Sequence, residues 1–82
     1  MTSTFIDNFN FIIKGQGIVG ELSVKIEWIY EQEWDSFFEP PVLVWQNYEI
    51  TLASLDALED RLGMRIQRVI LHPENRTGEI VL

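Results

Sequence analysis

The single histidine is the residue of this chain whose side chain is best suited to catalysis. His72 is followed by Pro73 and Glu74, and an imidazole acts as a general base when a nucleophile and an orienting carboxylate converge on it. The chain has no cysteine, which excludes a thiolate nucleophile and a thiolate-bound metal. Because nothing in the sequence indicates a nucleophile beside His72, we interpret it as a structural residue and expect a protein without catalytic activity.

Carboxylates recur at alternate positions in one short segment. Glu31, Glu33 and Asp35 would share one side of a strand if a strand continued through them, and such a trio could hold a calcium ion weakly. The sequence has neither the paired histidines of a zinc site nor the alternating ligands of an EF-hand loop. We prefer the interpretation of a solvated acidic edge, and we expect no metal and no cofactor.

Three glycines have the spacing of a dinucleotide-binding fingerprint. Gly15, Gly17 and Gly20 match Gly-x-Gly-x-x-Gly, a motif that must open a helix whose N-terminus receives a pyrophosphate. The residues that follow alternate with a period of two instead, which predicts a strand. We therefore interpret these glycines as part of a hairpin turn, since glycine adopts positive φ angles without strain.

The whole chain carries a net charge of −7, and its acidic residues are concentrated in the middle of the sequence. Residues 26–60 contain nine Asp and Glu and no Lys, Arg or His. Ordinary solvated surfaces mix both signs, so this bias indicates a surface that suits a basic protein partner. The same charge argues against direct binding to nucleic acid or to anionic lipid, because both need a basic footprint.

Within that acidic segment, residues 31–39 interleave carboxylates with three large aromatic rings. Aromatic residues are enriched among interface hot spots, and complementary charge speeds encounter. The opposing interpretation is that at least two of the rings of Trp34, Phe37 and Phe38 fold back onto the core, and the sequence leaves both open. The candidate partner-binding residues are Glu31, Glu33, Trp34, Asp35, Phe37, Phe38 and Glu39.

Hydrophobic periodicity predicts the elements that must position these residues. Residues 22–30 alternate between apolar and polar side chains, the pattern of a half-buried strand. Pro40 and Pro41 exclude a helix before the next strands, and Gln46-Asn47 suits a two-residue turn between them. The resulting order, β-β-β-β-α-β-β, indicates an α+β fold with a single, mostly antiparallel sheet of about five to six strands and one short helix packed on one face. The expected strands are residues 9–13, 22–30, 42–45, 48–51, 64–72 and 79–82.

One helix is expected, over residues 54–62. Ser54 is a good N-cap residue, and Gly63 stands where a left-handed residue commonly ends a helix. A helix this short does not persist alone, so it must lie on the sheet. The core should join its leucine stripe to the alternating strand, through Leu22, Val24, Ile26, Trp28, Leu55, Leu58 and Leu62.

Length and composition favour one domain, residues 1–82. A chain of 82 residues supports a single core. No segment approaches the roughly 20 apolar residues that a membrane span needs, and residues 1–10 lack the positively charged start of a signal peptide. The absence of cysteine favours the cytoplasm over an oxidising compartment.

The sequence therefore favours a small acidic protein-binding module, such as an inhibitor or an immunity- or antitoxin-like protein, that faces a basic partner. Small acidic α+β domains occur among toxin-neutralising immunity proteins and phage-encoded inhibitors, but this likeness is one of shape and charge, without a shared motif. The alternative is a structural subunit or homo-oligomer, such as a homodimer, that assembles through apolar strand pairing in residues 42–45.

Overall fold

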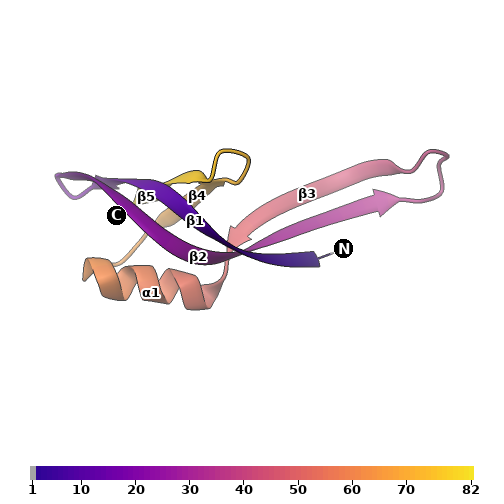
Figure 1. The fold of residues 1–82 in the computed structure, drawn as a ribbon. Helices are drawn as coiled ribbons and strands as arrows, with labels where there is room; N and C mark the ends of the chain where they lie inside the picture. Colours follow the sequence, from indigo (N-terminus) through magenta and orange to yellow (C-terminus); the bar gives the residue numbers. More distant parts are fainter. Residues whose placement is uncertain (1) are drawn as a thin grey trace.

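A computed structural model describes residues 2–82, so that Met1 of the predicted domain lies outside the described residues. Five strands form one sheet in the order β3-β2-β1-β5-β4 (Figure 1). The sheet is mixed, because β1 and β5 are parallel while the other three neighbouring pairs are antiparallel. The elements are β1 (Thr2–Gly15), β2 (Ile18–Asp35), β3 (Val42–Ile50), α1 (Leu52–Leu62), β4 (Arg68–His72) and β5 (Thr77–Val81).

The prediction of one sheet and one short helix holds in outline, but one predicted turn was wrong. Residues 46 and 47 lie inside the single strand β3, where Gln46 is opposite Gln32 and Asn47 is opposite Glu31. β2 supplies these partners because it continues through Asp35, five residues beyond the end of the predicted strand at residue 30. Pairing with this long strand keeps β3 extended without a turn, so three strands, not four, precede the helix in the order β-β-β-α-β-β, and the sheet has five strands, not six.

The turn between β1 and β2 lies where it was predicted. Gln16 and Gly17 have φ angles of 54° and 74°, and they join Gly15 to its partner Ile18 across the ladder. A strand rather than a helix follows the glycines, so they do not form a dinucleotide-binding fingerprint.

The core lies between the inner face of the sheet and α1. Of the predicted core residues, Ile26, Trp28 and Leu58 are buried, and Leu22, Val24 and Leu62 are half-buried and pack against them. Leu55 is half-buried too but lines a hollow beside β3 and β4. β1 and β5, together with the residue after β5, supply the rest of the core. The buried core residues are Phe9, Phe11, Ile13, Ile26, Trp28, Leu58, Ile80 and Leu82.

Helix α1 begins earlier than predicted. Its N-cap is Thr51, whose hydroxyl accepts a hydrogen bond from the Ser54 amide at 3.3 Å. The prediction of Ser54 as N-cap was wrong because the Ser54 hydroxyl is used elsewhere: it accepts a hydrogen bond from the Glu27 amide at 2.8 Å. The end of the helix is as predicted, since Gly63 is left-handed with a φ of 67° and its amide donates to the Glu59 carbonyl at 2.8 Å.

The start of α1 is held against the middle of β2. Besides the Ser54 contact, the Thr51 amide donates to the Glu27 carbonyl at 3.2 Å. The next residue of β2, Trp28, is paired with Ile50, the last residue of β3. The helix runs from this point along one half of the sheet, and the β2–β3 hairpin continues away from it on the other side (Figure 1). We call residues 29–49 the arm and the remainder the body; the whole molecule measures 50 × 21 × 20 Å.

The last hairpin differs from the prediction at both strands. β4 begins at Arg68 rather than at residue 64, and Gly78 lies within β5 rather than in the turn before it. A Cβ atom at Gly78 would lie 2.6 Å from Cε1 of Phe11 and 2.7 Å from the Ile70 carbonyl oxygen. Gly78 therefore lies in a strand and lets a buried ring and a neighbouring strand approach closely. The prediction had placed it in the turn because glycine is common in turns.

Candidate partner-binding surface

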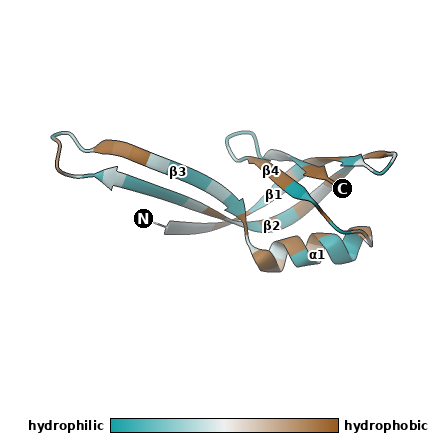
Figure 2. Cartoon of the chain, turned by 180° about the vertical axis from the view of Figure 1, so that it is seen from behind, coloured by the Kyte–Doolittle hydropathy of each residue, from teal (hydrophilic) through white to brown (hydrophobic). Residues whose placement is uncertain are grey.

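Apolar side chains gather on the arm without being buried. Phe37 at the tip is 89% exposed, Trp34 is 48% exposed and Trp45 is 44% exposed. No residue of the arm belongs to the buried core, so the interpretation of Trp34, Phe37 and Phe38 as core plugs is wrong. Figure 2 shows the hydrophobic end of β3 beside the tip, far from the helix. The arm's other exposed large apolar residues are Phe38, Val42, Leu43, Val44 and Tyr48.

Strand alternation sorts the side chains of the arm onto two faces. The register places Glu33 opposite Trp45 and Trp34 opposite Leu43, so these two successive pairs point to opposite sides of the hairpin. The side of Glu33 carries carboxylates from both strands, and the side of Trp34 carries no charge. We call them the acidic face (Glu31, Glu33, Asp35, Val42, Trp45, Asn47 and Glu49) and the aromatic face (Tyr30, Gln32, Trp34, Leu43, Gln46 and Tyr48).

A β-bulge in β3 changes the register near the tip. Val44 is the extra residue, since the partners of Glu33 and Trp34 are Trp45 and Leu43. Bulges re-aim the side chains around them, and here Val44 and Trp45 border one hollow at the outer end of the arm. The hollow is lined by Glu33, Trp34, Asp35, Ser36, Val44 and Trp45.

The carboxylates of the arm are not neutralised by basic groups. Residues 29–49 contain five acidic residues and no Lys, Arg or His, and the ion pairs found among residues 2–82 all lie in the body. Two carboxylates have neutral donors: the Trp45 indole Nε1 donates to Glu33 Oε2, and the Phe37 amide donates to Asp35 Oδ1 at 3.0 Å. Because neutral donors leave the charge in place, the acidic face keeps a negative field.

Aromatic contacts join the root of the arm to the body. Tyr30 and Tyr48 stack with their ring centroids 5.2 Å apart, and Tyr48 meets Trp28 edge-on at 6.2 Å. Trp28 in turn stacks on Phe5 at 5.0 Å, and the Tyr30 hydroxyl donates to Gln46 Oε1 at 3.3 Å. Aromatic pairs of this kind add stability beyond their buried area, so the arm leaves the body as an ordered hairpin.

The structure brings together only part of the predicted site. Glu31, Glu33 and Asp35 share the acidic face, whereas Trp34 belongs to the aromatic face. The rings of the tip, Phe37 and Phe38, meet edge-on with centroids 5.8 Å apart, and Glu39 is exposed just after them.

Sequence reasoning missed Trp45 as a member of the site. The false turn after it had placed Trp45 at the end of a short strand. The signal that could have located it was the period-two spacing of Glu31, Glu33 and Asp35, which continues the strand and requires a partner strand beside it.

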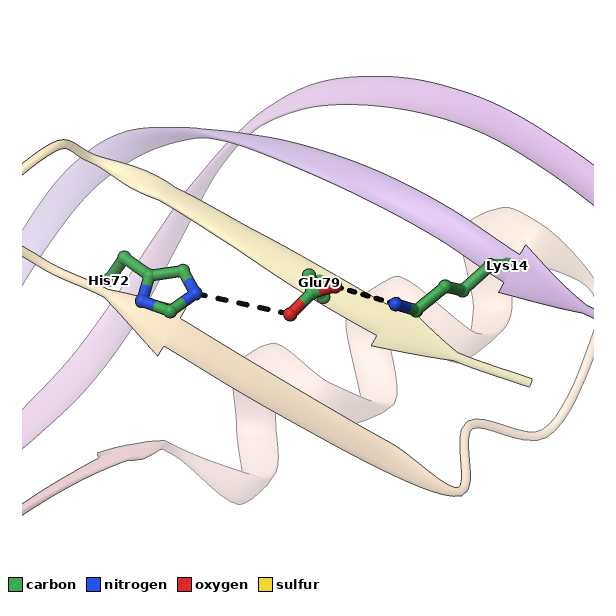
Figure 3. A network of polar contacts seen from close by, with 3 residues as sticks. All are labelled: Lys14, His72 and Glu79. Atoms are coloured by element: carbon green, nitrogen blue, oxygen red, sulfur yellow. Dashed lines mark hydrogen bonds and ion pairs between the residues drawn. The ribbon is translucent and has the colours of Figure 1, made fainter.

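A second polar cluster lies on the outer face of the body (Figure 3). Lys14 Nζ donates to Glu79 Oε1 at 2.6 Å, and His72 Nε2 lies 4.0 Å from Glu79 Oε2. The hydrogen bond and positive charge of Lys14 lower the pKa of Glu79, with smaller contributions from His72 and Arg68. Among residues 2–82 no Ser or Thr hydroxyl bonds to His72, so the cluster has the chemistry of an ion pair and lacks a nucleophile.

Neither a metal site nor a membrane-spanning helix is found in the described part of the chain. Within residues 2–82, no three His, Asp or Glu side chains are grouped so that they could hold a metal ion. Alternate residues of a strand are about 6.6 Å apart, which spreads Glu31, Glu33 and Asp35 along the arm. No helix between residues 2 and 82 combines the length and the apolar character that crossing a membrane requires.

Comparisons of this chain with protein-family models, with curated proteins and with solved structures found no match.

Proposed function

We propose that this chain is a non-catalytic module that binds a basic protein through its arm. The observation that carries the proposal is that exposed aromatic rings and unneutralised carboxylates occur together on one projecting hairpin. The surface comprises the predicted residues, Glu31, Glu33, Trp34, Asp35, Phe37, Phe38 and Glu39, together with Trp45.

The chemistry of the acidic face favours a partner rich in arginine or lysine. A cation over an indole ring gains an electrostatic attraction, and the carboxylates of Glu33 and Asp35 border the same hollow as Trp45. Negative charge on the arm also steers a positive surface toward it, which raises the association rate. A nucleic-acid-binding site on an enzyme is one such surface, and carboxylates would occupy it in place of phosphates, as an inhibitor or immunity protein would require.

Order in the free arm supports tight binding. The arm is a paired hairpin with stacked rings at its root, so little backbone freedom remains to be lost when a partner binds. Exposed rings on an ordered scaffold bury apolar area at low entropic cost, which is the usual property of hot-spot residues. We include a cytoplasmic location in the proposal, since a cysteine-free chain suits a reducing compartment.

The experiment begins with affinity capture from the native host. The association rate of the captured basic protein is then measured with the wild-type chain and with charge variants. The double variant Glu33→Lys with Asp35→Lys should slow association more than tenfold at low salt and flatten its salt dependence. The matched control is Glu21→Lys, which reverses an exposed carboxylate at the opposite end of the molecule. If both changes slowed association equally, net charge alone would govern binding and the arm would not be the site.

Alanine substitutions at the two indoles test the apolar part of the surface. Trp45→Ala on the acidic face should weaken binding by about 2 kcal/mol, as truncation of a hot-spot residue does. Trp34→Ala should weaken binding by a similar amount if the partner also covers the aromatic face. Calorimetric titration measures both. Unchanged affinity in both variants would contradict the proposal.

A further inference from the structure

The outer edge of β3 is unpaired along most of the arm. β3 is the last strand of the sheet on its side, and its base approaches β4 only near residues 48–50. Along residues 42–47 nothing in the described chain pairs with that edge. An open edge of this kind presents unused backbone donors and acceptors to another strand.

Apart from the bulge at Val44, this edge lacks the features that usually prevent strand pairing. Residues 40–48 form the longest run of the chain without Asp, Glu, Lys, Arg or His, and β3 contains only one charged residue, Glu49. Natural edge strands are commonly protected by a lysine, an inward-pointing charge or a covering segment. A chain with a net charge of −7 repels its copies elsewhere, so a second copy fits best where charge is absent.

An antiparallel pairing of two β3 strands about a two-fold axis satisfies the charge pattern. If the axis passes between the two Gln46 residues, Trp45 of each copy lies opposite Asn47 of the other, and Val44 stays unpaired as the extra residue of its bulge. Beyond the bulge, Glu49 of each copy then lies opposite Val42 of the other, and no two carboxylates of β3 face each other. The same register places Tyr48 opposite Leu43, and both belong to the aromatic face. A self-complementary patch of this kind is what a two-fold interface requires.

The same register also brings the exposed tip to a hollow. Pro41 of one copy would lie opposite Ile50 of the other, so Phe38, 52% exposed, would reach the seam between β3, α1 and β4. An open hollow of about 210 Å³ is present there, lined by Tyr48, Glu49, Ile50, Leu55, Ile66, Gln67, Arg68 and Val69. A cavity of about 150 Å³ accepts benzene, so this hollow has room for one phenyl ring.

We propose that the chain forms a symmetric homodimer in which residues 43–48 of the two β3 strands pair antiparallel and Phe38 of each copy fills the hollow of the other. The two sheets then become one continuous sheet with both acidic faces on it. The dimer does not depend on the function proposed above, because it forms in the absence of any other protein. It covers Phe38, so that a basic partner of the dimer would meet the acidic faces, with Trp45, rather than that ring.

The interface is small, and its strength follows from its size. A short segment of β3 and one ring from each copy bury less than the roughly 800 Å² per partner of a standard interface. Interfaces below the standard size belong mostly to weak complexes, so we expect a dissociation constant of about 1–10 μM, measured by sedimentation equilibrium of the purified chain. Because the paired strands are uncharged where they meet, 1 M salt should leave the dimer intact or strengthen it.

Two matched valine variants test the pairing. Val44→Lys places a charge on the proposed edge, at a side chain that is 59% exposed. It should raise the dissociation constant of the dimer at least tenfold and leave the melting temperature of the monomer unchanged. Val19→Lys makes the same change at a side chain that is 85% exposed, beside the β1–β2 turn, and should leave the dimer unchanged. A wild-type chain that is monomeric at 100 μM, or equal effects of the two variants, would overturn the proposal.

Cross-linking tests the antiparallel register. The chain has no cysteine, so single-cysteine variants react at one position only. A short bis-maleimide should join Leu43→Cys chains to Tyr48→Cys chains when the two are mixed, and should join neither variant efficiently to itself. Stronger cross-linking within each variant than between them would indicate a parallel arrangement and overturn the proposal. Phe38→Ala should weaken the dimer about tenfold, and an unchanged dissociation constant would exclude its ring from the interface.

Discussion

The body and the arm share one strand but differ in what covers it. β2 runs through both, and Trp28 and Trp34 stand six residues apart on it. Trp28 is buried among core residues, and its Nε1 donates to Asp7 Oδ2 at 2.9 Å, whereas the ring of Trp34 is half-exposed. Helix α1 lies along one half of the sheet and not along the arm (Figure 1). Burial of a large ring is therefore decided here by the neighbouring element rather than by the strand's own pattern.

The body supplies the buried apolar area that stabilises the fold, whereas the arm supplies the exposed area proposed for binding. Burial of apolar area stabilises the fold in proportion to the area removed from water, and that area lies in the body. The exposed rings of the arm remain available to contribute the same kind of free energy when another protein covers them. Each region can therefore be changed with little effect on the other, which the following substitutions test.

The two tryptophans of β2 give the largest expected difference. Trp28→Ala should lower the free energy of unfolding by about 3–5 kcal/mol, since it empties a large core site and removes the indole donor of the Asp7 carboxylate, which keeps only its ion pair with Arg76. Trp34→Ala should change it by less than about 1 kcal/mol, as exposed substitutions do. Urea denaturation at a low protein concentration measures both values. A comparable loss in the two variants would show that the arm is part of the cooperative core.

Truncation of a helix leucine tests whether α1 is packed as described. Leu58 is the buried residue of the helix, and Leu58→Ala should cost about 2–5 kcal/mol. Leu52→Ala on the same helix is the control, because that side chain is 78% exposed. Thermal melts that shift by only a degree or two in Leu58→Ala would contradict docking of the helix on the sheet.

Close approach at Gly78 should make a single added methyl group destabilising. The Cβ of Gly78→Ala would meet the Ile70 carbonyl oxygen, which belongs to backbone and cannot turn away. We expect a loss of about 1–3 kcal/mol, typical of overpacking. Gly20→Ala is the matched control, since a Cβ there has no neighbour within 4 Å. Equal melting temperatures for the two variants would refute the steric role of Gly78.

The sequence sufficed for the elements whose signals are local. The hairpin turn at Gln16-Gly17 and the left-handed end of the helix at Gly63 depend on residues that are themselves the signal. Ser54 and Gly78 misled the prediction because each has two uses: a hydroxyl can cap its own helix or bind another strand, and a glycine can turn the chain or permit close packing. Only the tertiary neighbours distinguish these uses.

The candidate site was predictable in composition but not in arrangement. The acidic and aromatic residues of the arm were identified from charge and residue type, but their distribution over two faces depends on strand pairing. The bulge at Val44 and the partner assignment of Trp45 arise from the ladder with β2, a long-range contact that carries no local signal. The length of β2 was missed although Glu31, Glu33 and Asp35 alternate, because an exposed strand has no buried face and so does not alternate between apolar and polar side chains.

The smallest expected effect concerns the ion pair of Lys14 with Glu79 on the body. Lys14 lowers the pKa of Glu79 below its ordinary value of 4.5, so the ionised carboxylate stabilises the folded state. That contribution is present above pH 4.5 and is lost as the pH falls through the lowered pKa of the folded state. The loss in stability caused by Glu79→Gln should therefore be small at pH 7, because the pair is exposed, and should vanish in strong acid. Glu74→Gln, at an exposed carboxylate without an ion pair among the described residues, is the control. Urea denaturation at pH 7 and pH 3 measures the difference, and a loss in Glu79→Gln that did not change with pH would show that the Lys14 contact contributes no stability.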